Sequence, residues 1–161
     1  MAKSKENKTN AMRQLEKLNI PYSYRTYECE EFTDAQQIAD LLGLDHRQVF
    51  KTLVTKGGSG GYFVFVIPID EELDLKKAAR AVSEKAVSMI PVKDILSVTG
   101  YIRGGCTAIG MKKNYPARID TAARAFDTIV VSGGRIGIQI ELRPDDLKTA
   151  AHAEYADLIR T

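Results

Sequence analysis

The feature that most constrains the fold is a pair of apolar segments joined by a glycine-rich turn. Residues 49–56 predict a strand, residues 57–61 (Gly-Gly-Ser-Gly-Gly) a flexible turn, and residues 62–69 the partner strand. The second strand, Tyr-Phe-Val-Phe-Val-Ile-Pro-Ile, is apolar on both faces. Such a strand belongs in the middle of a sheet whose two sides are covered. The chain is therefore expected to build layers around this hairpin.

The remaining pattern mixes helices and strands without a regular strand–helix–strand alternation. Helices are expected from Thr9 or Asn10 to Ile20, from a Thr33–Gln36 capping box to Gly43, from Asp74 to Val82, in a turn after Pro91, and from Pro144 toward Leu158. Further strands are expected at residues 22–27, 117–120, 128–132 and 135–142, the last two joined by Gly133 and Gly134, with a glycine-rich loop at 100–110. This pattern predicts an α+β fold with a mixed sheet.

Composition agrees with one domain spanning residues 1–161. The chain has a mass of 17.8 kDa, 44% hydrophobic and 27% charged residues, enough to bury a core without a disulfide or metal. No apolar run is long enough to cross a membrane, and the basic start leads into no signal-peptide core. Cys29 and Cys106 form no CxxC pair. We expect a cytoplasmic protein without a membrane contact.

Several enzyme classes lack their motifs. His46 and His152 are far apart and show no zinc-binding spacing, and no GxSxG sequence is present. Gly105 to Gly110 has the spacing of a phosphate-binding loop, but Met111 occupies the position of the required lysine. We therefore expect neither a metal nor a cofactor.

Three features remain as candidates for chemistry. Lys51 lies in an apolar strand, where burying an ammonium group costs folding free energy. Such a lysine is expected to bind a ligand, to form an ion pair or to extend its charged end to solvent. The loop at 100–110 can present backbone N–H groups to an anion or carbonyl oxygen, or can simply be a tight turn. Gln139 and Glu141 share the strand face opposite the apolar row, and that face can line a cleft or meet water.

The charges are unevenly distributed although the net charge is only +2. Residues 28–45 contain six acidic residues and no basic one. In residues 95–119 every charged residue is basic: Arg103, Lys112, Lys113 and Arg118. The basic stretch suits a phosphate-rich partner, but charge alone favours a solvated surface.

Six short segments together resemble the YbaK/EbsC family. They are Arg25–Tyr27, Gln48–Leu53, Leu73–Ala78, Thr99–Gly105, Gly110–Lys113 and Val131–Gly134, and they occur in the family's order at compatible spacing. Members of this family are free-standing cysteinyl-tRNA(Pro) deacylases related to the editing domain of prolyl-tRNA synthetases. The resemblance implies a single compact α+β domain with a mixed, partly closed sheet. It also implies a trans-editing enzyme that hydrolyses an aminoacyl-tRNA ester, with prolyl-tRNA synthetase as a candidate partner.

The resemblance also assigns site residues. It places the essential lysine at Lys51. The implied substrate-binding residues are Tyr27, Phe32, Thr52, Gly104, Gly105, Ser132 and Gln139. The basic residues expected to meet the tRNA backbone are Arg103, Lys112 and Lys113.

Two positions depart from the family pattern. Thr107 is followed by Ala108 where proline is common, and Gln139 stands where aspartate is frequent. Either change can alter the preferred amino acid. The alternative hypothesis is a non-catalytic RNA-binding or regulatory protein that retains the fold, in which the aromatic strand at 61–66 resembles an RNA-binding strand.

Overall fold

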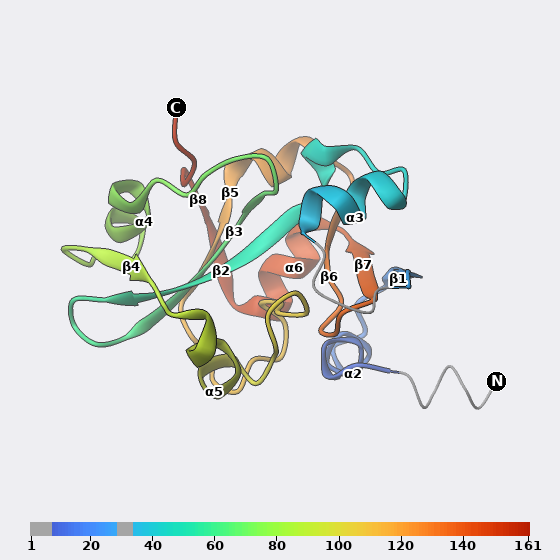
Figure 1. Ribbon diagram of the computed structural model, residues 1–161, viewed down its shortest axis with the longest axis horizontal. Coiled ribbons are helices and arrows are strands. Elements are labelled where there is room, and N and C mark those ends of the chain that lie inside the picture. Colours follow the sequence, from blue (N-terminus) through green and yellow to red (C-terminus); the bar gives the residue numbers. More distant parts are fainter. Residues whose placement is uncertain (1–7, 29–33) are drawn as a thin grey trace.

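The computed structural model describes residues 8–28 and 34–161. Its elements are α2 (Asn10–Lys17), β1 (Ser23–Thr26), α3 (Ala35–Leu41), η1 (His46–Gln48), β2 (Phe50–Gly57), β3 (Tyr62–Pro68), α4 (Leu75–Ala81), β4 (Val87–Met89), η2 (Val92–Asp94), α5 (Ile95–Thr99), β5 (Ala117–Asp120), η3 (Thr121–Ala125), β6 (Ile129–Ser132), β7 (Ile138–Leu142), α6 (Pro144–Ala151) and β8 (Ala153–Ala156). Figure 1 shows their arrangement.

The strands form two sheets that meet at one point. A five-stranded sheet has the order β4-β2-β3-β5-β8, and a three-stranded sheet has the order β1-β7-β6. A parallel bridge between Val49 and Val130 joins them at the start of β2. The first sheet contains antiparallel and parallel pairs, so the α+β class and the mixed sheet are confirmed.

The predicted hairpin is confirmed and forms the centre of the larger sheet. β2 and β3 pair antiparallel from Phe50–Pro68 to Lys56–Tyr62. Side chains of β3 alternate between two cores: Val64 and Val66 pack between the sheets with α2 and α6, whereas the other face of β3 packs against α4. Both faces of β3 are thus covered, which explains its continuous apolar sequence.

Helix starts follow the capping residues of the sequence, with one correction. Thr9 caps α2 and Asp74 caps α4, as predicted. The capping box of α3 is formed by Asp34 and Gln37, one residue later than the predicted Thr33–Gln36 pair. Thr33 lies outside the described residues. The Gln36 side chain instead donates to the Ile69 carbonyl at 2.6 Å, so it is unavailable for capping.

The prediction for the C-terminal segment was wrong. α6 ends at Ala151 because His152 adopts a left-handed conformation (φ 54°), and the following residues form β8. β8 pairs parallel with β5 and supplies partners to backbone groups that would otherwise form an open sheet edge. β7 is also shorter than predicted: it begins at Ile138, because the turn after β6 extends through Gly134 and Gly137, both with positive φ. The short strand β4 was not predicted.

Candidate functional site

A cavity lies where the two sheets separate. β2 contacts β6 at the Val49–Val130 bridge and pairs with β4 from Thr55 onward. Between these two points, its edge away from β3 pairs with no strand in the described part of the chain. A cavity of about 460 Å³ borders this stretch of β2.

Strand alternation directs the backbone of Thr52 toward this cavity. The Val49 carbonyl accepts a hydrogen bond from Ile69 on the β3 side, whereas the Val54 carbonyl accepts one from Ile90 on the opposite side. In an antiparallel pair, successive residues alternate between these two directions. The N–H and C=O of Thr52 therefore point away from β3, and the predicted residue Thr52 lines the cavity.

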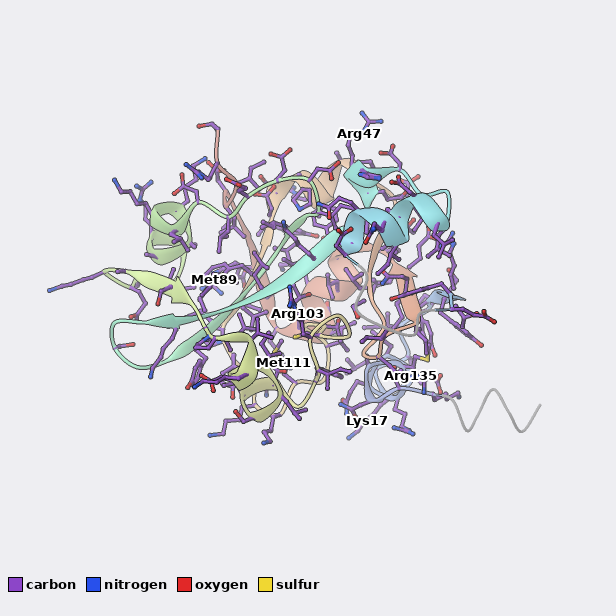
Figure 2. The ribbon with its side chains drawn as sticks, in the orientation of Figure 1. Lys17, Arg47, Met89, Arg103, Met111 and Arg135 are labelled. Atoms are coloured by element: carbon purple, nitrogen blue, oxygen red, sulfur yellow. The ribbon has the colours of Figure 1, made fainter. Side chains whose placement is uncertain are left out.

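The cavity has an apolar wall and a polar wall. The apolar lining residues include Val54, Met89, Ile90, Val92 and Ile95. The predicted residues that line the cavity are Lys51, Thr52, Arg103, Gly104, Ser132 and Gln139. Figure 2 shows Arg103 between the glycine-rich loop and β2, with Met89 on β4. The fold thus brings together residues from β2, β6, β7 and the loop after α5.

Lys51 is half-buried at this cavity. Its Nζ donates to the Ile69 carbonyl at 3.2 Å, and the same oxygen accepts the hydrogen bond from Gln36. Burial lowers the pKa of Lys51, while the negative charges of Glu72, Asp70 and Glu71 oppose this shift. Sequence reasoning missed Gln36 as a lining residue, because its contact with Ile69 links two distant segments.

The glycine-rich loop contributes Gly104 and Cys106 to the lining. Gly104 has φ 87°, a conformation that glycine adopts without strain. Gly105 does not line the cavity: its N–H donates to the Ile102 carbonyl, and an added Cβ would lie 2.8 Å from the Cα of Arg135. Burial raises the pKa of the Cys106 thiol to about 11, so this thiol stays protonated at neutral pH.

Ser132 and Gln139 are cross-strand partners on β6 and β7. Gln139 is only 6% exposed and lines the cavity. Glu141, on the same face of β7, forms an ion pair with Arg25 at 2.7 Å and accepts a hydrogen bond from Thr128. These contacts lower the pKa of Glu141, with the Thr128 hydrogen bond as the largest cause. Gln139 thus borders the cavity, whereas the carboxylate of Glu141 is paired with Arg25 and Thr128.

The remaining predicted residues lie outside the cavity lining or outside the described residues. The Tyr27 hydroxyl is buried and has no hydrogen-bond partner among the described residues, but Tyr27 is absent from the lining. Lys112 and Lys113 are exposed on the loop, and Lys112 Nζ donates to the Ser97 carbonyl. Phe32 falls outside the described residues.

Two other kinds of feature are absent from residues 8–28 and 34–161. This part of the chain contains no group of three or more His, Cys, Asp or Glu side chains arranged to hold a metal ion. None of its helices has the length and apolar character needed to span a bilayer.

Comparison with known proteins gives consistent matches. The family model of the aminoacyl-tRNA editing domain matches residues 29–150. The chain is 44% identical over 160 residues to EbsC of Enterococcus faecalis, a protein named for Cys-tRNA(Pro)/Cys-tRNA(Cys) deacylase activity, and the alignment covers 98% of each chain. It is also 35% identical over 99 residues to the proline–tRNA ligase of Fervidobacterium nodosum, covering 62% of this chain and 17% of the ligase.

The fold also has solved relatives. A crystal structure described as a trans-editing enzyme for prolyl-tRNA synthetase matches with a TM-score of 0.81 at 23% identity, covering 94% of this chain and 96% of the other. This likeness supports the fold. Together with the family match over most of the sequence, it agrees with the resemblance seen in the sequence motifs. The chain belongs to the aminoacyl-tRNA editing domain family.

Proposed function

We propose that this chain is a trans-editing deacylase that hydrolyses the aminoacyl ester of cysteinyl-tRNA(Pro). The observation that carries the proposal is that Lys51 and Gly104 line one cavity of about 460 Å³ together with apolar residues. The proposal is supported by the family match and by the activity for which EbsC of Enterococcus faecalis is named. Prolyl-tRNA synthetase is the proposed partner.

The proposed roles follow from charge and position. Lys51 binds the terminal ribose or its phosphate, and the loop backbone around Gly104 donates to the scissile carbonyl oxygen. One such donor to a developing oxyanion contributes roughly 3 kcal/mol. Arg103, Lys112 and Lys113 contact phosphates of the acceptor stem, which adds affinity that does not depend on sequence.

The nucleophile in this proposal is the thiol of the substrate. Among the described lining residues, Cys106 is the one thiol, and it remains protonated. The substrate sulfur attacks its own carbonyl carbon, a C–S bond forms, and the ester C–O bond breaks. The thiol proton passes to the departing ribose oxygen, and water then opens the thiolactone to cysteine. Orientation alone can supply an effective molarity of about 10⁵ M or more for such an intramolecular attack.

The test is single-turnover release of cysteine from cysteinyl-tRNA(Pro), with and without prolyl-tRNA synthetase. Lys51→Ala should abolish release and leave the circular dichroism spectrum unchanged. Lys56→Ala is the matched control, because Lys56 lies on the same strand but is exposed beside the Tyr62 ring. Equal rates for wild type and Lys51→Ala would refute the proposed site. Alanyl-tRNA(Pro), which lacks the thiol, should be hydrolysed far more slowly.

An RNA-binding role without catalysis predicts a different result. The protein would then bind both tRNAs and release neither amino acid under any condition tested.

A further inference from the structure

β2 has one residue whose backbone edge is open at the cavity. The strand is bridged to β6 at Val49 and paired with β4 from Thr55 onward, as its course in Figure 1 shows. Thr52 lies between these contacts and lines the cavity, with its N–H and C=O directed away from β3. Within residues 8–28 and 34–161, no group forms a hydrogen bond with this N–H or C=O on that side. Thr52 thus presents half of a β bridge to the cavity.

An α-aminoacyl group carries the complementary pair of polar groups. Its amino group donates and its carbonyl oxygen accepts, and the two are spaced like the N–H and C=O of one amino-acid residue. Opposite Thr52 it pairs as one residue of an antiparallel strand: its amino N–H donates to the Thr52 carbonyl, and the Thr52 N–H donates to its carbonyl oxygen. That oxygen has two lone pairs, so it also accepts from the proposed donor at Gly104.

The face of β2 on which Thr52 lies is apolar at this edge. Thr52 and Val54 project to the same face, because they are two residues apart. Val54 packs there in a core cluster with Ile90, and Ile95 and Cys106 pack against this cluster. All five residues line the cavity. A side chain opposite Thr52 lies on this face, because directly opposed residues of an antiparallel pair project to the same side.

The opposite face of β2 carries the lysine. Lys51 and Leu53 project there, and Lys51 and Gln36 both donate to the Ile69 carbonyl. Inverting the configuration of the aminoacyl Cα exchanges its hydrogen and its Cβ. A D-aminoacyl group that kept both hydrogen bonds to Thr52 would therefore direct its side chain toward Lys51 and away from the apolar face.

We propose that the Thr52 backbone holds the aminoacyl group as a one-residue β bridge and thereby makes the site select the L configuration. The inference rests on the proposed deacylase function. The Thr52 N–H acts on the reacting carbonyl, and the Thr52 carbonyl positions the amino group. The selected side chain lies on the face of Val54 and Ile95.

The experiment compares kcat/KM for L-cysteinyl-tRNA(Pro) and D-cysteinyl-tRNA(Pro), each corrected for spontaneous hydrolysis. Both substrates carry the same thiol and the same ester, so their intrinsic reactivity is nearly equal. Wild type should prefer the L substrate by at least about tenfold, because the D substrate must give up a hydrogen bond to Thr52 or place its side chain against Lys51.

Two variants of Thr52 locate the effect in the backbone. Thr52→Pro removes the N–H, and proline is tolerated at a strand edge where this group is outside the ladder. Thr52→Val is the matched control, because it keeps the N–H and replaces only the hydroxyl. Relative to Thr52→Val, Thr52→Pro should lower kcat/KM for the L substrate by about 10²-fold and move the L-to-D ratio toward one. Circular dichroism and urea titration verify that both variants fold.

The outcomes separate the two hypotheses. If Thr52→Pro and Thr52→Val show the same rates and the same L-to-D ratio, the bridge is overturned while the deacylase function stands. If wild type does not hydrolyse the L substrate, the proposed function itself is wrong.

A substrate change keeps the test decisive if Thr52→Pro fails to fold. 3-Mercaptopropionyl-tRNA(Pro) retains the thiol and lacks the amino group, so it cannot donate to the Thr52 carbonyl. Relative to its own spontaneous rate, wild type should hydrolyse it at least about tenfold less efficiently than the L-cysteinyl substrate. Equal efficiency for these two substrates, or for the L and D substrates, would overturn the proposal.

Discussion

Lys51, the lysine proposed to bind the substrate, carries a charge that is unfavourable for the fold. Burial lowers the pKa of its ammonium group, which means that folding disfavours the charged form. For such a base the unfolded chain binds more protons, so stability rises with pH between the folded and the unfolded pKa values. At neutral pH the charged lysine therefore destabilises the native state.

The first prediction follows from the destabilising effect of the charged lysine at neutral pH. Lys51→Met keeps the length of the side chain and removes the charge, so it should raise the free energy of unfolding by up to about 1 kcal/mol at pH 7 while abolishing deacylation. Urea titration and the release assay measure the two effects. The gain should shrink toward pH 11, where the lysine is neutral. A loss of stability at pH 7 would show that the ammonium group is stabilised by its contacts.

A second prediction concerns Gly105, where the loop and the β6–β7 turn touch. Gly105→Ala places a Cβ 2.8 Å from the Arg135 Cα, and neither backbone can move freely. Overpacking of this kind costs about 1–3 kcal/mol, and the displaced loop should also reduce deacylation. Gly58→Ala is the control, because nothing lies within 4 Å of its added Cβ. Similar urea midpoints for the two variants would contradict this role for Gly105.

Among the elements, α3 is joined to the segment after β3 by His46 as well as by the Gln36 side chain. His46 Nε2 contacts Asp40 at 2.7 Å, and its Nδ1 contacts Asp70 at 2.9 Å beyond the end of β3. The hydrogen bond to Asp40, followed by that to Asp70, raises the pKa of His46. A raised folded pKa gives stability that is complete below the unfolded value of about 6.5 and is lost as pH rises through the folded value.

The third prediction is a pH-dependent effect of His46→Gln. The variant should be less stable than wild type near pH 6, and the difference should decrease as pH approaches 9. Unfolding midpoints across this range measure it. His152→Asn is the control, because asparagine tolerates the left-handed conformation that ends α6. A pH-independent difference for His46→Gln would indicate that the imidazole stabilises the fold through contacts unrelated to its charge.

Local elements were largely predictable, and the exceptions have a common cause. The β2–β3 hairpin, the Asp74 cap and the left-handed Gly43 depend on neighbouring residues, and the structure confirms all three. The strand β8 was predicted as helix because its alanines favour helices locally, whereas its pairing with β5 is a tertiary contact. For the same reason the site prediction included Lys51 but missed Gln36, whose partner Ile69 is 33 residues away.

At the scale of the whole molecule, the basic residues Lys112 and Lys113 are exposed to solvent. Lys113 is exposed, while Lys112 donates to the Ser97 carbonyl. In Figure 2, Arg47 lies at the top of the molecule, well separated from the loop residue Arg103. These positions allow the proposed tRNA surface to be tested against a distant cation.

The fourth prediction is that Lys113→Ala weakens tRNA binding and reduces the slope of log K against log salt by about one unit. The rate at saturating substrate should change little, because the residue acts before the chemical step. Arg47→Ala should change neither affinity nor slope. Fluorescence anisotropy at several salt concentrations measures both quantities. If Lys113→Ala and Arg47→Ala behave alike, the loop does not contact the tRNA backbone.

The separation of the two sheets has a consequence for the order in which the molecule becomes active. β2 and β3 are neighbours in sequence, whereas β1 and β7 come from opposite ends of the chain. Closing the longer loop costs more chain entropy, so we expect β1 and β7 to pair after the hairpin. Ser132 and Gln139 belong to this late sheet, and Lys51 belongs to the early one. During refolding, therefore, fluorescence or circular dichroism changes from the hairpin should precede recovery of deacylation. Activity would report the slowest assembly step, and a chain interrupted before β7 would contain Lys51 but lack Gln139 on the opposite side of the proposed site.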